Sequence, residues 1–169
     1  QMVFAAEVKM KDQVADIYPD LPKSSGRINN DLMYRHWDQW VDTFSHLFVA
    51  STTNGMITNG TDIMQGEPWE SPVRPFGGME QVAWTLDNDG ILYCSRKKVG
   101  KDYALSTNTD VYKYKVSTGE TINLTEGMMG YDQNIAIAPR GNKLAWESME
   151  RDGYESDKIR LYVMDLSTG

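Results

Sequence analysis

The sequence predicts an all-β fold, a partial β-propeller of about two and a half four-stranded blades, with a short helical insertion in the first blade. One block of sequence occurs in three similar copies, at residues 2–7 and 47–55, 82–95 and 111–119, and 135–148 and 161–169. The glycines that close the copies, Gly55, Gly119 and Gly169, are roughly 50 to 65 residues apart, which is typical of propeller blades rather than helical repeats. Asp-Gly and Ser-Thr-Gly sequences, which favour tight hairpin turns, separate the apolar runs.

The first expected unit, residues 1–61, is an incomplete blade. It begins with the second strand of a blade at residues 2–8. After an insertion at residues 11–44, it resumes with a third strand at residues 45–51 and an outer strand near residues 56–61. No innermost strand precedes these three.

The insertion differs in character from the strands around it. A turn-rich stretch at residues 18–26 is followed by five apolar residues spaced as one stripe of an α-helix. Asn30 or Asp31 is a suitable N-cap for such a helix. The sequence therefore predicts a short helix, whose tryptophans pack against the blade or, alternatively, stack on a ligand. The stripe consists of Met33, Trp37, Trp40, Val41 and Phe44.

Residues 62–125 are expected to form an inter-blade linker followed by a complete blade. Its four strands are predicted at residues 81–86, 91–96, 110–116 and 120–125. Residues 111–116 approach the alternation of a half-buried strand. Residues 87–90 (DNDG) have the composition of a hairpin turn and lack the further ligands of a calcium loop.

The last unit, residues 126–169, is expected to be an incomplete blade that lacks its outer strand. Its three strands are predicted at residues 134–138, 142–148 and 158–166. Because both ends of the chain fall inside blades, we expect a fragment of a longer propeller. Open strand edges are templates for pairing with other strands, so we also expect association through these edges.

Charge and composition narrow the possible functions. The chain has 17 Lys plus Arg against 24 Asp plus Glu, a formal net charge of −7, and its basic residues are scattered. This pattern argues against binding to nucleic acid or to an anionic membrane. No apolar run approaches the roughly 20 residues of a membrane span, and the first residues lack the features of a signal peptide. Cys94 lies in an apolar strand pattern, which predicts a buried, inert thiol.

Catalytic and cofactor motifs are absent from the sequence. It contains no nucleophile elbow, no phosphate-binding loop and no zinc-protease helix. His36 and His46 lie in different predicted elements without the spacing of a zinc site. We therefore expect neither a cofactor nor a catalytic residue in this chain.

Carboxylates are concentrated in two places, around Trp69 and in the acidic stretch at residues 147–157. Glu67 and Glu70 flank Trp69 in a proline-containing loop. One interpretation is a solvated loop. The alternative is that a fixed carboxylate binds a cationic group, such as the α-ammonium of a peptide.

The most specific signal in the chain is the hairpin sequence ESMERDGYESDK, followed by RLYVMDLSTG. Together with several other segments, it resembles the N-terminal β-propeller of bacterial dipeptidyl aminopeptidases and acylaminoacyl peptidases, which belong to the prolyl oligopeptidase family. The resemblance spans essentially the whole chain. The similar segments are residues 32–41, 106–114, 123–132, 147–158 and 160–169.

The resemblance implies a serine exopeptidase in which this propeller caps a C-terminal α/β-hydrolase domain with the catalytic triad. The propeller would admit short peptides to the catalytic chamber and exclude folded proteins. The resemblance also favours a periplasmic or secreted location. By position, Arg96 would bind a substrate carbonyl, and Glu67 or Glu70 the substrate ammonium. The other candidate substrate-binding residues are Trp69, Arg35 and Trp37.

A different class of function is also compatible with the sequence. The same loop face of a propeller could hold a protein partner without any chemistry. A Gly-x-Ser-x-Gly segment beyond residue 169, followed by an Asp and a His, would identify the peptidase. A chain that ends after its remaining blades would identify the binding module.

Overall fold

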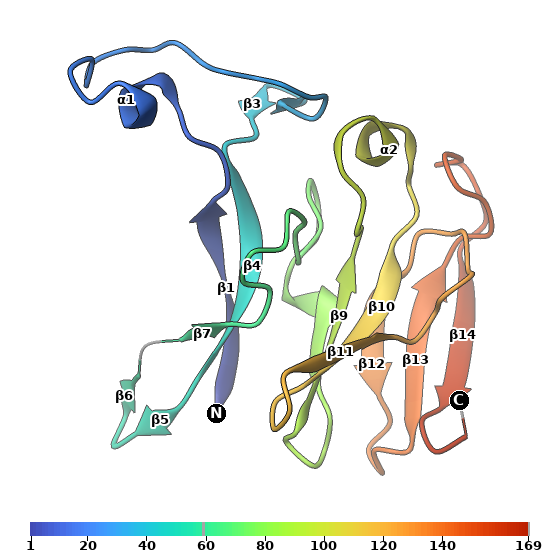
Figure 1. Ribbon diagram of the computed structural model, residues 1–169. Coiled ribbons are helices and arrows are strands. Elements are labelled where there is room, and N and C mark those ends of the chain that lie inside the picture. Colours follow the sequence, from blue (N-terminus) through green and yellow to red (C-terminus); the bar gives the residue numbers. More distant parts are fainter. Residues whose placement is uncertain (59, 169) are drawn as a thin grey trace.

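The structure is a computed structural model that describes residues 1–58 and 60–168. Three antiparallel β-sheets are its main elements and stand side by side in sequence order (Figure 1). The nearly all-β class expected from the sequence is confirmed. Asn59, within the predicted outer strand of the first unit, and Gly169, the last closing glycine, lie outside the described residues.

The first sheet has the strand order β1-β4-β7. β1 pairs with β4 along its whole length, which confirms the first two predicted strands of this unit. The predicted outer strand is only partly right, because residues 56–57 pair locally with residues 52–53 as the hairpin β5-β6. Asn54 and Gly55, both at positive φ, supply the two-residue turn that folds this hairpin back on itself. The strands are β1 (Met2–Lys9), β4 (Thr43–Ala50), β5 (Thr52–Thr53), β6 (Met56–Ile57) and β7 (Thr61–Asp62).

The second and third sheets follow the predicted strand pattern closely. The second is a four-stranded meander, β8-β9-β10-β11, and the third has the order β12-β13-β14. Residues 87–89 form the turn between β8 and β9, where the carboxylate of Asp87 accepts hydrogen bonds from Thr85 and from the Asp89 amide. The strands are β8 (Val82–Trp84), β9 (Gly90–Ser95), β10 (Asp110–Lys115), β11 (Glu120–Asn123), β12 (Gln133–Ile137), β13 (Lys143–Ser148) and β14 (Arg160–Asp165).

The helix predicted in the insertion is wrong. Residues 35–40 form a small β-hairpin, β2 (Arg35–His36) and β3 (Gln39–Trp40), and the helical turn of the insertion lies earlier, as α1 (Val14–Ile17). Met33 has φ 59° and Trp37 has φ 54°, values that a right-handed helix excludes. Of the stripe that suggested a helix, Trp37 and Trp40 lie in the hairpin and Phe44 in β4, whereas Met33 and Val41 lie outside these strands.

The three sheets pack face to face through two apolar clusters. Alternation along β9 directs Leu92 and Cys94 toward the third sheet and Tyr93 toward the first. Between the first two sheets, Leu47 and Met64 contact Tyr93. Between the second and third sheets lie Leu92, Cys94, Val111, Ile135, Leu144 and Trp146.

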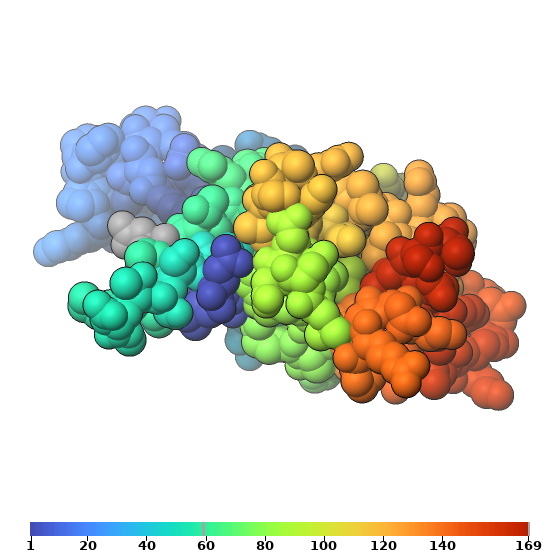
Figure 2. Space-filling view, turned by 90° about the horizontal axis from the view of Figure 1, so that it is seen from below, coloured from blue at the N-terminus to red at the C-terminus, as the bar shows by residue number. Residues whose placement is uncertain are grey.

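The loops and the tight turns gather at opposite ends of the sheets. The insertion, the β9–β10 loop with α2 (Gly100–Leu105), and the β13–β14 loop all lie at the upper end in Figure 1. Seen from the turn end, the units follow one another in a row from the N-terminus to the C-terminus (Figure 2). Within the described parts of the chain, no helix has the length and apolar character needed to cross a membrane.

Candidate functional site

The loop end of the molecule contains a cleft of about 840 Å³, here called the loop-end cleft. Its walls come from five segments: the insertion, the linker before β8, the β9–β10 loop, the linker before β12 and the β13–β14 loop. Two residues predicted to bind substrate, Arg96 and Trp37, lie in these walls. The polar and aromatic lining residues include His36, Trp37, Arg74, Phe76, Arg96, Tyr103 and Glu155.

Arg96 leaves the end of β9 and is held from several sides. Its Nε donates to the carbonyl of Asn108 at 3.3 Å and its Nη2 to the carbonyl of Thr107 at 3.5 Å. The guanidinium carbon lies 4.8 Å from the ring centroid of Tyr103. A guanidinium supported in this way can offer its remaining N–H groups to a carbonyl or carboxylate.

Trp37 sits in the β2–β3 turn with φ 54° and is 69% exposed. A bulky residue with a positive φ is unusual, because this backbone conformation costs energy. Strained backbone of this kind is characteristic of functional sites. Its ring makes an edge contact with Phe76 at 5.4 Å between centroids and stacks against His36 at 5.9 Å. Desolvation and the charge of Arg74 lower the pKa of His36, so its ring is neutral at pH 7. These rings form an apolar rim on the cleft.

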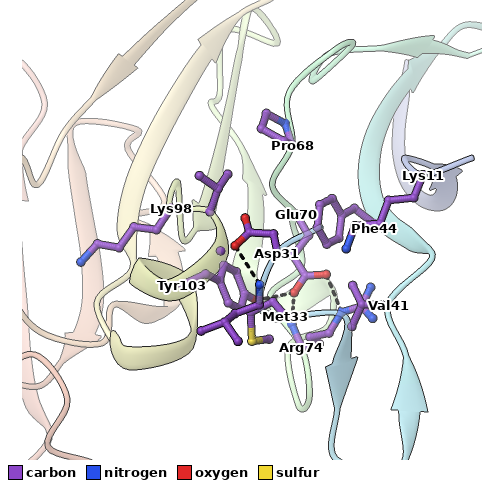
Figure 3. Close-up of a pocket in the computed structure, with 13 residues that line it drawn as sticks. Lys11, Asp31, Met33, Val41, Phe44, Pro68, Glu70, Arg74, Lys98 and Tyr103 are labelled. Atoms are coloured by element: carbon purple, nitrogen blue, oxygen red, sulfur yellow. Dashed lines mark hydrogen bonds and ion pairs between the residues drawn. The ribbon is translucent and has the colours of Figure 1, made fainter. Parts of the chain in front are cut away.

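Glu70 is not in a solvated loop, in contrast to the first interpretation of the sequence. Only 1% exposed, it accepts hydrogen bonds from Arg74 Nε at 2.6 Å and from the Tyr103 hydroxyl at 2.7 Å. In Figure 3 these three side chains point toward one another beside a small pocket of about 140 Å³ between the insertion and α2. Both carboxylate oxygens therefore already have partners, and Glu70 is not open to a substrate ammonium.

Glu67 and Trp69 lie apart from the loop-end cleft. Lys97 Nζ is 3.1 and 3.2 Å from the two carboxylate oxygens of Glu67, and the indole N–H of Trp69 donates to Glu67 at 2.6 Å. The same ammonium lies 4.4 Å from the ring centroid of Tyr112 and 5.8 Å from that of Trp69. The position predicted to bind a cation thus binds the protein's own Lys97.

Arg35 lies outside the walls of the cleft but supports one of them. Its Nε donates to the carbonyl of Trp37 at 3.2 Å, and its guanidinium lies 5.4 Å from the ring centroid of Trp40. These contacts tie the strand β2 to the turn that carries Trp37. Arg35 therefore stabilises the hairpin rather than lining the cleft.

One residue that joins two walls of the cleft was not among the site residues predicted from the sequence. Asp152, in the β13–β14 loop, accepts hydrogen bonds from the Ser106 hydroxyl at 2.7 Å and from the amides of Thr107 and Asn108 at 2.8 and 3.1 Å. Partial desolvation opposes its ionisation, but these hydrogen bonds, with one from Lys98, lower the pKa of Asp152 to about 2. The carboxylate is therefore charged and holds the β9–β10 and β13–β14 loops together.

Phe76, Tyr103 and Glu155 also line the cleft and are not distinguished by any motif in the sequence. Tyr103 lies in α2, a six-residue helix inside a predicted hairpin loop. Such a short helix carries no distinct sequence signal. Glu155 belongs to the acidic stretch at residues 147–157, and no hydrogen bond or ion pair joins it to the other described residues.

No group of three or more His, Cys, Asp or Glu side chains within residues 1–58 and 60–168 is placed to hold a metal ion. Cys94 is completely buried, as predicted, and burial raises the pKa of its thiol. The groups that the cleft presents include the guanidinium of Arg96 and the aromatic rim around Trp37.

Comparison with known proteins reveals clear relatives. A dipeptidyl-peptidase 5 of Porphyromonas gingivalis is 54% identical over 169 residues, which is 100% of this chain and 25% of that protein. A dipeptidyl-peptidase 5 of Porphyromonas endodontalis is 51% identical over 164 residues, which is 97% of this chain and 24% of that protein. A probable dipeptidyl-peptidase 5 of Aspergillus niger is 29% identical over 181 residues, covering 92% and 24%. A scan against protein-family models finds no match.

The chain therefore spans about a quarter of the length of the curated relatives it matches. The segments that carried the resemblance in the sequence are all contained in this match. The chain is similar, from its first to its last residue, to one segment of proteins named dipeptidyl-peptidase 5.

Proposed function

We propose that this chain forms consecutive blades of a β-propeller in a dipeptidyl peptidase of the prolyl oligopeptidase family. Two observations support the proposal: the similarity to proteins named dipeptidyl-peptidase 5 over the whole chain, and three antiparallel sheets that pack face to face in sequence order. A single propeller blade cannot bury both of its faces alone, and stacking of this kind is how neighbouring blades do so. The propeller would limit access of short peptides to a C-terminal α/β-hydrolase domain that carries the catalytic triad.

The loop-end cleft is the part of this propeller that contacts the peptide. The observation that carries this assignment is that Arg96 and Trp37, from loops far apart in the sequence, line the same cleft. A peptide presents carbonyl oxygens that a guanidinium can bind and side chains that an aromatic rim can cover. Glu155, from the β13–β14 loop, is an exposed carboxylate available to a cationic group.

The test is to replace Arg96 in the full-length peptidase and to measure hydrolysis of a dipeptidyl amide with a chromogenic leaving group. Arg96→Ala should raise KM by about tenfold or more, because a charged hydrogen bond contributes roughly 1.5–3 kcal/mol to binding and about 1.4 kcal/mol corresponds to a factor of ten. The matched control is Arg140→Ala. Arg140 is exposed and lies in the turn between β12 and β13, at the opposite end of the sheets. An unchanged KM for Arg96→Ala in a folded, active enzyme would overturn the proposed role of the cleft.

A further inference from the structure

Behind the loop-end cleft, a buried carboxylate holds the aromatic ring on which Arg96 rests. We infer that Glu70 and Tyr103 are positioning residues, which fix the guanidinium of Arg96 in the cleft and whose own polar groups bind each other rather than the peptide. The inference rests on the proposed function, because it concerns how Arg96 is presented to a peptide.

The hydrogen bonds of Arg96 to the protein are long. At 3.3 and 3.5 Å, its bonds to the carbonyls of Asn108 and Thr107 exceed the usual range for N–H···O contacts. The ring of Tyr103, with its centroid 4.8 Å from the guanidinium carbon, is therefore a principal support. Where this ring lies decides where the guanidinium lies.

Tyr103 owes its place to contacts outside its own helix. The six-residue helix α2 is too short to be stable by itself. The Tyr103 hydroxyl donates to Glu70 Oε1 at 2.7 Å, and the residue is buried. Desolvation, together with the charge of Glu70, raises the pKa of the Tyr103 hydroxyl, so it keeps its proton and remains a donor at every physiological pH.

Glu70 is anchored in turn from the other side. Arg74 pairs with its carboxylate through Nε at 2.6 Å and through its backbone amide at 3.2 Å. Arg74 Nη2 also donates to the carbonyl of Thr43, the first residue of β4, at 2.8 Å. A continuous chain of contacts therefore runs from the first sheet to the guanidinium in the cleft. Because both oxygens of Glu70 are used in this chain, its role is positioning rather than direct binding of a substrate ammonium.

Tyr103→Phe in the full-length peptidase is the sharpest test. It keeps the ring beneath Arg96 and removes only the hydroxyl that Glu70 holds. Removing Glu70 instead would leave the charge of Arg74 without its main partner and would destabilise the fold. We expect Tyr103→Phe to raise KM for the chromogenic dipeptidyl amide by about three- to tenfold with kcat unchanged. Tyr18→Phe, at an exposed tyrosine in the insertion, is the control and should leave both parameters unchanged.

The double variant separates positioning from a general structural role. If Tyr103 acts through Arg96, the Arg96→Ala/Tyr103→Phe enzyme should have the same KM as Arg96→Ala alone. An unchanged KM for Tyr103→Phe, or effects that multiply in the double variant, would overturn the inference while Arg96 keeps its proposed role. An unchanged KM for Arg96→Ala would instead remove the proposed function, and this inference with it. Thermal unfolding of each variant checks that it is folded.

Discussion

The second and third sheets have similar sequences but differ in how their faces are covered. All six residues of β9, in the second sheet, are buried, because the first sheet covers one face and the third sheet the other. In β14, of the third sheet, Tyr162 and Met164 pack inward, whereas Leu161 and Val163 are 72% and 58% exposed. The apolar residues on both faces of β14 resemble those of a strand that is covered on both sides. The repeat therefore encodes a unit with two apolar faces, and the neighbouring sheets decide which of these faces is covered.

The largest effect is expected where the second sheet is covered. Leu92→Ala removes a completely buried side chain from the cluster between the second and third sheets. We expect the free energy of unfolding to fall by about 3 kcal/mol, through lost burial and the remaining cavity. The matched control is Leu161→Ala in the 169-residue chain, which should change the free energy of unfolding by less than about 0.5 kcal/mol. Denaturant unfolding measures both, and equal losses would contradict the difference between the two sheets.

The interface between the second and third sheets also contains a carboxyl group with a raised pKa, that of Asp132. Asp132 is completely buried before β12, and neither of its carboxylate oxygens makes a hydrogen bond to the described residues. Desolvation, with a smaller contribution from the charge of Asp110, raises its pKa to about 6. Ser148, Thr125 and Trp146 lie near enough to oppose the shift in part.

A raised carboxyl pKa means that the folded protein prefers the protonated form. The stabilisation of the folded state by the protonated Asp132 is fully present below about pH 4 and is lost as the pH rises through about 6. Asparagine cannot ionise. The free energy of unfolding of Asp132→Asn, relative to that of the unsubstituted protein, should therefore rise by roughly 2–3 kcal/mol between pH 4 and pH 7. Unfolding in denaturant at several pH values measures this shift. Parallel pH profiles for the two proteins would show that Asp132 is not desolvated as the structure indicates.

The regular part of the fold could be predicted from the sequence because its signals are local. The alternation of residues 111–116 and the turn at residues 87–90 are sufficient to identify the strands of the second sheet. The hairpin at residues 35–40 could not be predicted in this way, because its apolar spacing fits a helix equally well. The positive φ of Met33 and Trp37 excludes the helix, and the ring of Trp37 contacts Phe76 and His36.

The candidate site was predictable only in part, for a related reason. Arg96 could be located because it ends a recognisable strand, and Trp37 because it lies in the insertion. The burial of Glu70 depends on Tyr103, 33 residues further along the chain, and on Arg74. Glu67 is likewise paired with Lys97, 30 residues away. Long-range pairs of this kind leave no local pattern, so a carboxylate bound to its own protein and one open to a ligand look alike in the sequence.

The smallest effect on stability, and the most direct test of the third sheet, is expected at its exposed face. Leu161→Lys with Val163→Lys replaces two exposed apolar side chains of β14 and should change the unfolding free energy of the 169-residue chain by less than about 0.5 kcal/mol. It should also abolish the self-association that we propose for this chain. Lysines on an edge strand disfavour pairing with another strand, and their charges disfavour stacking of this face against a second molecule. Sedimentation of both forms across a range of concentrations measures this. In the full-length protein, where the proposed propeller would cover this face with the next blade, the same substitutions should instead destabilise the fold strongly. If they were tolerated there as well, the face would be a true surface and the third sheet would end the stack.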